Sequence, residues 1–309
     1  MELLYPIIPI LLSILGLAVA VEWVSWQRQR YESRRRSPLS AKLLRSPGSS
    51  IRAEFDELAV DRDAWLFLAA LGPLIVFSVH VAQSYLVGTP ESLVRIGLSV
   101  VAGLLMLVVA ISKLHTLAKR RWQLRCGMEA ELAMGRELDQ LMRSGAVVFH
   151  DVPAEHFNID HVVITQGGLY AVETKGRTKP KTDRGKEGVT VVYDGKVLTF
   201  PDWVEREPIE QARRQAKWLA KWLTSAVGEK VEVKPVVALP GWYVERKARN
   251  DVNVISGMEA PILLKGTPGL TLADSLVRRI AHQLEQRCRD VEPVFYRKGR
   301  RVEFQRRGK

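Results

Sequence analysis

Three charged residues interrupt an otherwise apolar hairpin pattern in the stretch DHVVITQGGLYAVETK. Two strand-like runs flank Gly167-Gly168, a pair typical of a tight turn. The charged residues are Asp160, Glu173 and Lys175, which are costly to bury unless they pair or bind something. They are therefore the first candidates for chemistry.

A two-residue turn predicts that Asp160 lies directly opposite Lys175. Glu173 then lies diagonally from Asp160 on the same face, with Cβ atoms about 7–8 Å apart. Two carboxylates at this separation can bind one divalent ion, and a neighbouring ammonium can orient or help deprotonate an attacking water. An ordinary salt-bridged strand face is the alternative explanation of the same three residues.

Two flanking helices could supply further polar groups. The run 128–143 has the spacing of an amphipathic helix and carries Glu131, a third carboxylate that could complete a metal site or position a water. A second helix is predicted to begin at Pro208 and continue to about residue 226, with Gln211 near its N-terminus. Both predicted strands are apolar on both faces, which predicts a buried sheet and favours a special role for its charges.

Together these features resemble the nuclease-related domain, NERD, a branch of the PD-(D/E)XK nuclease-like superfamily. The resemblance covers roughly residues 126–245. One departure is Ala130, which stands where a second glycine is expected. The matching elements, in order, are Gly127-x-x-x-Glu131, Asn158-Ile159-Asp160-His161, Gly167-Gly168, Val172-Glu173-Thr174-Lys175 and Pro208-x-x-Gln211-Ala212.

The resemblance implies an α/β fold with a restriction-endonuclease-like mixed sheet flanked by helices. It implies that Asp160 and Glu173 bind Mg²⁺ or Mn²⁺, with Glu131 as an additional acidic ligand. Lys175 would assist the water and Gln211 would support the site. His161 accompanies the aspartate in the family pattern. It could contact phosphate, but we expect it to be a structural histidine on the opposite face.

Contacts to nucleic acid would come from basic side chains near this site. An ordinary solvated basic face is the alternative for each of them. Trp218, Trp222 and Trp242 could stack on bases, but core packing is their expected role. DNA is favoured over RNA as the partner. The candidate contacts are Arg177, Lys179, Arg213, Arg214, Lys217 and Lys221.

The N-terminal third of the chain contains three long runs without charge at neutral pH. A helix of about 20 apolar residues crosses a bilayer, so we predict an α-helical transmembrane region with helices at about 3–21, 64–87 and 96–112. A cleaved signal peptide is the alternative for the first run, but no basic segment precedes its apolar core.

Lysine and arginine in the flanking loops predict the orientation. Both the loop 24–62 and the segment that follows residue 112 are strongly basic, whereas the loop 88–93 contains no lysine or arginine. We therefore expect a multi-pass protein of the cell (inner) membrane, with its N-terminus outside and its C-terminal domain in the cytoplasm. The two isolated cysteines suit that reducing compartment.

These predictions divide the chain into a membrane region at 1–112, a NERD domain at 113–290 and a basic mobile tail at 291–309. The predicted function is a membrane-anchored, divalent-metal-dependent nuclease. The alternative is a non-catalytic nuclease-fold module that tethers a nucleic acid or protein to the membrane. A transporter fits poorly, because the apolar runs hold few polar groups. The protein partners and the oligomeric state stay open.

Overall fold

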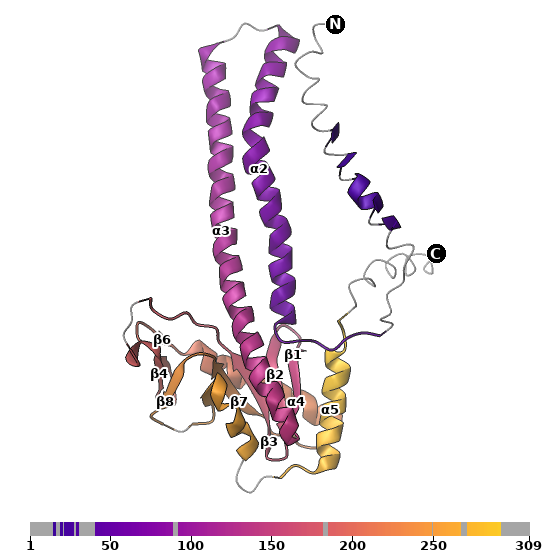
Figure 1. Ribbon diagram of the computed structural model, residues 1–309, viewed down its shortest axis with the longest axis vertical. Helices are drawn as coiled ribbons and strands as arrows, with labels where there is room; N and C mark the ends of the chain where they lie inside the picture. The colour runs from indigo at the N-terminus through magenta and orange to yellow at the C-terminus, as the bar shows by residue number, and fades with distance from the viewer. Residues whose placement is uncertain are drawn as a thin grey trace. The chain divides into compact units, whose positions relative to one another are not determined.

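Figure 1 shows the computed structural model of the chain. The chain divides into two compact units. The main described part of one unit is Asp56–Arg121, and the other unit consists of Ala41–Phe55 with Trp122–Pro293. The described residues are 15–16, 19–20, 22–27, 29–30, 41–88, 92–181, 185–248, 250–266 and 271–291.

The first unit is built from helices α2 (Ser49–Val87) and α3 (Leu93–Gln140). The N-terminal end of α2, up to Phe55, and the C-terminal end of α3, from Trp122, belong to the second unit. By length and composition both helices are able to cross a membrane, with mean hydropathies of 2.0 and 2.5 over their most apolar windows. The predicted helices 64–87 and 96–112 lie within them. The predicted helix 3–21 and the predicted tail 291–309 fall almost entirely outside the described residues.

The second unit contains a five-stranded mixed sheet with the order β1-β2-β3-β7-β9. Strands β1, β2 and β3 pair antiparallel, whereas β7 and β9 continue the sheet in parallel from β3. This arrangement confirms the predicted α/β fold with a mixed sheet. The strands are β1 (Val147–Pro153), β2 (Asn158–Thr165), β3 (Gly168–Thr174), β7 (Lys234–Leu239) and β9 (Asn253–Ser256).

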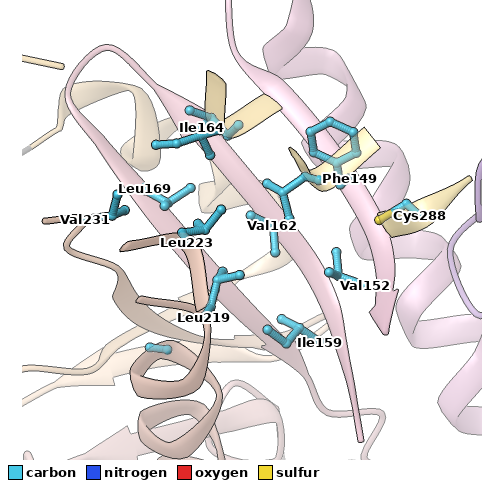
Figure 2. Packing of buried hydrophobic residues seen from close by; sticks show 14 of the residues in the cluster. Phe149, Val152, Ile159, Val162, Ile164, Leu169, Leu219, Leu223, Val231 and Cys288 are labelled. Atoms are coloured by element: carbon cyan, nitrogen blue, oxygen red, sulfur yellow. The ribbon is translucent and has the colours of Figure 1, made fainter. Parts of the chain in front are cut away.

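Helices cover both faces of this sheet. On one face, α4 (Glu207–Val227) and α5 (Asp274–Cys288) pack against the alternate side chains of β1, β2 and β3 (Figure 2). The C-terminal part of α3, the 3₁₀ helix η2 (Leu141–Ser144) and the 3₁₀ helix η4 (Gly257–Lys265) pack against the other face. Burial on both faces explains why the strands are apolar at nearly every position.

A smaller sheet lies beside α4 and has the order β6-β5-β4-β8. It shares a core with α4 and β7, in which Trp242 is 2% exposed. Its strands are β4 (Thr190–Tyr193), β5 (Leu198–Thr199), β6 (Val204–Glu205) and β8 (Tyr243–Arg246), and the short 3₁₀ helix η3 (Glu187–Val189) precedes them.

Two sequence-based expectations differ from this fold. The apolar run 262–264 has by itself the composition of a short strand, but these residues belong to η4, where a capping box between Ser256 and Glu259 begins a helical turn. The predicted domain at 113–290 also omits residues 41–55, which the sequence assigned to the membrane region but which pack in the second unit.

Candidate active site

The pairing of β2 with β3 differs by two residues from the predicted register. Thr165 pairs with Gly168 and His161 pairs with Val172, so the next position places Asp160 opposite Glu173. The prediction that Asp160 lies directly opposite Lys175 is therefore wrong, because Gly168 is a strand residue and the loop is formed by residues 166 and 167. A shift of two keeps each side chain on its predicted face.

The three charged residues of the hairpin do converge. Lys175 Nζ lies 2.5 Å from Glu173 Oε1, and it donates a hydrogen bond of 2.9 Å to Gln211 Oε1. Asp160 Oδ2 accepts a 2.6 Å hydrogen bond from the backbone N–H of Thr174, between the glutamate and the lysine. Glu173 is only 2% exposed, so this cluster is a buried polar network and not a solvated strand face.

Helix α4 supplies a second glutamine that the sequence analysis did not identify. The Gln215 side chain is 1% exposed, and its Nε2 donates to Glu173 Oε2 at 2.5 Å and to Asn158 O at 3.3 Å. Its position one turn after Gln211 was the available signal, because residues four apart share a helix face. Together the two glutamines and Lys175 hold the Glu173 carboxylate in one orientation.

Glu131 reaches the same site from α3 and is 7% exposed. Burial raises its pKa to about 8, and the negative charges of Asp151 and Glu173 add to this shift. Burial also raises the pKa of Asp160 well above its ordinary value, and the negative charges of Glu173 and Glu131 raise it further. Lys175 opposes both shifts but does not cancel them. The positive charge of Lys175 is therefore too small to compensate for the buried carboxylates around it.

The close approach of α3 depends on the glycine that follows Lys175. A Cβ atom at Gly176 would lie 2.6 Å from the carbonyl oxygen of Cys126 and 3.0 Å from Cβ of Ala130. Because no side chain fits there, α3 can lie directly against the end of β3 and bring Glu131 to the site. The small Ala130, at the one departure from the family pattern, faces this contact.

His161 lies on the opposite face of β2, as its alternation with Asp160 requires. It is fully buried, and its Nδ1 is 2.9 Å from Nδ1 of His150, which in turn contacts Asp139 at 3.0 Å. Burial lowers the pKa of His161 well below its ordinary value. Its surroundings are those of a structural histidine.

The candidate nucleic-acid contacts separate into two groups. Arg177 forms a double ion pair with Glu205 at 2.8 and 2.9 Å, and Arg213 forms another with Asp251 at 2.7 and 2.8 Å. Such side chains hold the fold and are poorly available to phosphate. Arg214 likewise pairs with an acidic neighbour, Glu207, at 2.6 Å.

The lysine candidates form the second group. Lys179, Lys217 and Lys221 are exposed, and none has an ion pair among the described residues. Lys179 Nζ lies 5.8 Å from the centroid of the Trp242 ring. Trp242 itself is buried, and its indole N–H donates to the carbonyl of Arg177, which agrees with its expected core role.

The site therefore brings carboxylates, a lysine and two glutamines together on a mixed α/β sheet. Residues 127–240 match the family model of the nuclease-related domain, NERD, and this match confirms the predicted resemblance. Two helices apolar enough to span a membrane precede most of this domain. No curated protein and no solved structure matches the chain.

Proposed function

We propose that this chain is a membrane-anchored, divalent-metal-dependent nuclease that hydrolyses phosphodiester bonds of cytoplasmic nucleic acid. The observation that carries the proposal is the convergence of Asp160, Glu173, Lys175 and Gln211 within a nuclease-related domain. A strand pair that needed these residues only for stability would gain little from burying them, because desolvation offsets much of the attraction between buried charges.

The donor set fits a hard divalent cation. Mg²⁺ is commonly bound by one or two carboxylates, with water and substrate phosphate completing its shell. Asp160 and Glu173 would hold the ion, and Glu131 would act as the additional acidic group. The raised pKa values of Asp160 and Glu131 support this assignment, because crowded, buried carboxylates favour a nearby cation. A bound ion would neutralise charge on the phosphodiester and lower the pKa of a water.

The chain's own residues would orient the reactants. Gln215 and Lys175 each bind one oxygen of Glu173 and so fix its carboxylate plane. Gln211 keeps the Lys175 ammonium beside that carboxylate, from where it can orient an attacking water. The backbone N–H of Thr174 fixes Asp160 through Oδ2 and leaves Oδ1 without a hydrogen bond from the described residues.

Substrate binding would depend on the exposed lysines. Lys217 and Lys221 lie on α4, beyond the turns that carry the two glutamines. Phosphate contacts from such side chains give affinity without sequence preference. Lys179, which follows β3 and is exposed, would add a further phosphate contact, and we favour DNA as the substrate.

The membrane anchor follows from α2 and α3 and from the charges near them. Large apolar side chains on both helices are exposed, among them Phe77 at 62% and Leu98 at 64%, and a lipid environment would cover them. The basic residues that flank the helices favour the cytoplasm for the nuclease-related domain and the outside for the N-terminus.

One observation favours a second candidate, a non-catalytic module that binds nucleic acid or protein. Both carboxylate oxygens of Glu173 already have protein partners. Within the described ranges, no three histidine, cysteine, aspartate or glutamate side chains are placed to hold a metal ion by themselves. A site used only for binding would keep its fold and lack turnover.

Cleavage by the full-length chain in detergent micelles or nanodiscs tests the proposal. Supercoiled plasmid, single-stranded DNA and RNA are offered with Mg²⁺, Mn²⁺ or EDTA to the wild type and to Asp160→Asn and Lys175→Ala. Lys196→Ala is the matched control, because this exposed lysine lies in the turn between β4 and β5. Metal-dependent cleavage that both site variants lose and the control keeps supports the nuclease. A folded wild type that cuts none of these substrates refutes it in favour of the binding module.

A further inference from the structure

The segment that precedes α2 is docked on the nuclease-related domain and is not a free linker. We define residues 41–50 as the strap. Leu43 pairs with Val291 through two backbone hydrogen bonds of 2.8 and 3.2 Å, and the N–H of Arg45 donates to the carbonyl of Cys288 at 3.1 Å. The strap thus continues along the end of α5 to the edge of the main sheet.

Arg45 fastens the strap by binding two carboxylates at once. Its guanidinium donates to both oxygens of Asp290 at 2.8 and 2.7 Å, and Nη1 donates to Asp151 Oδ2 at 3.0 Å. Asp151 is 3% exposed and has a positive φ of 49°, an unusual conformation for a residue other than glycine. The same Oδ2 accepts from the backbone N–H and the hydroxyl of Ser50, at 3.0 and 2.8 Å.

A chain of hydrogen bonds connects this cluster to Glu173. The Asn158 side-chain amide donates to Ser50 Oγ at 2.6 Å. The carbonyl of Asn158 accepts from Gln215 Nε2, which also binds Glu173 Oε2. One residue, Asn158, therefore connects Ser50 to the glutamine that orients the proposed metal ligand.

The strap also touches the helix that carries Glu131. Pro47 packs where Gly135 of α3 has no side chain, since a Cβ there would lie 2.5 Å from Pro47 Cγ. Gly48 has a φ of +70°, and a Cβ atom there would lie 3.3 Å from Cγ of Met128 and 3.8 Å from Oε2 of Glu131. The turn at Pro47-Gly48 thus limits how far the Glu131 carboxylate can move.

We infer that the strap is an integral part of the nuclease site, with Arg45, Ser50 and Asp151 as positioning residues for Glu131 and Glu173. This inference rests on the proposed function. The strap reaches the site from two sides, through Asn158 and through the close approach of Gly48 to Glu131. A domain cut after the apolar helices would lack it, so the activity of the site depends on a segment far away in the sequence.

The test measures Mn²⁺ binding and cleavage separately on the full-length chain. Free Mn²⁺ is followed by electron paramagnetic resonance while wild type, Ser50→Ala and Arg45→Ala are titrated, and kcat and KM are measured on the most rapidly cut nucleic acid. Arg52→Ala is the matched control, because Arg52 follows the strap by two residues and is exposed. Thermal unfolding is recorded for every variant.

We expect Ser50→Ala to unfold within a few degrees of the wild type. Its half-saturating Mn²⁺ concentration should rise about tenfold and its kcat should fall by at least tenfold, with KM for nucleic acid unchanged within a factor of two. Arg45→Ala should show larger losses, and Arg45→Lys, which keeps the charge but not the double contact, should lie between them. Arg52→Ala should match the wild type.

Ser50→Ala decides the outcome if Arg45→Ala fails to fold, since it removes a single hydroxyl. A folded Ser50→Ala with wild-type Mn²⁺ affinity and kcat overturns the inference. If wild type binds Mn²⁺ and cleaves nothing, the nuclease proposal fails while the Mn²⁺ affinities still test the strap. A wild type that neither binds Mn²⁺ nor cleaves refutes both.

Discussion

Gly176 provides the sharpest test of how the fold builds the site. It is the residue after Lys175, and it is where α3 lies closest to the end of β3. In Gly176→Ala the new methyl group would lie 2.6 Å from the carbonyl oxygen of Cys126, 3.0 Å from Cβ of Ala130 and 3.1 Å from the carbonyl carbon of Cys126. Two of these three atoms are backbone atoms, so no rotation of a side chain can relieve the contact.

The size of the effect follows from these distances. Real Cβ atoms essentially never approach another heavy atom within 3.0 Å, so α3 and the end of β3 must separate by at least about 0.4 Å. Overpacking of this kind typically costs about 1–3 kcal/mol. At about 2–4 °C for each kcal/mol in a domain of this size, the melting temperature should fall by roughly 2–12 °C. Because Glu131 moves with α3, cleavage should fall by more than tenfold, since a displacement of about 1 Å can cost 10²-fold.

The assay compares Gly176→Ala with Gly257→Ala in the full-length chain. Gly257 has no positive φ, and a Cβ there would meet Pro240 at 3.8 Å, an ordinary contact. The control should therefore keep both the melting temperature and the cleavage rate of the wild type. A Gly176→Ala protein with the stability and the activity of the control would refute the reasoning that a bare glycine sets the position of α3.

Two further predictions concern buried groups of the same domain. Gln215→Met preserves volume but leaves a buried oxygen of Glu173 without its hydrogen-bond donor, so the free energy of unfolding should fall by about 1–3 kcal/mol. Urea unfolding measures this change, and an unchanged midpoint would show that the hydrogen bond does not contribute to stability. Burial raises the pKa of Cys288 to about 12 and leaves it 1% exposed, so a thiol reagent at pH 8 should modify the half-buried Cys126 first. Peptide mass spectrometry checks the order, and faster labelling of Cys288 would contradict the packing of α5.

The mixed sheet was implied by the resemblance to the nuclease-related domain, whereas the face of the hairpin was predicted from a local pattern. Alternation alone places Asp160 and Glu173 on one side of the strands, whatever the register. The register itself was predicted wrongly. Gly167-Gly168 has the composition of a two-residue turn, but Gly167 also packs against the backbone of Gly266. A Cβ atom at Gly167 would lie only 2.5 Å from Cα of Gly266. A distant segment therefore requires that glycine, and no local turn rule contains this information.

The candidate site was predicted in part for the same reason. Gln211 was found from the family pattern, whereas Gln215 was overlooked among the packing residues of α4, although it binds Glu173 directly. Arg177 and Arg213 were candidate phosphate ligands by charge alone. Their acidic partners, Glu205 and Asp251, follow 28 and 38 residues later, and only the tertiary structure pairs them.

The strap shows most clearly where sequence reasoning ends. Residues 41–50 have the composition of a basic linker, and Arg45 is one arginine among many in its loop. Its partners Asp151 and Asp290 lie 106 and 245 residues further along the chain. Removing Arg45 would leave the buried Asp151 with only Ser50 as a partner, and breaking a buried ion pair typically costs about 3–5 kcal/mol. A contact of that strength between the start of a helix and the main sheet is not expected of a linker, and it makes the segment before α2 part of the architecture of the nuclease-related domain.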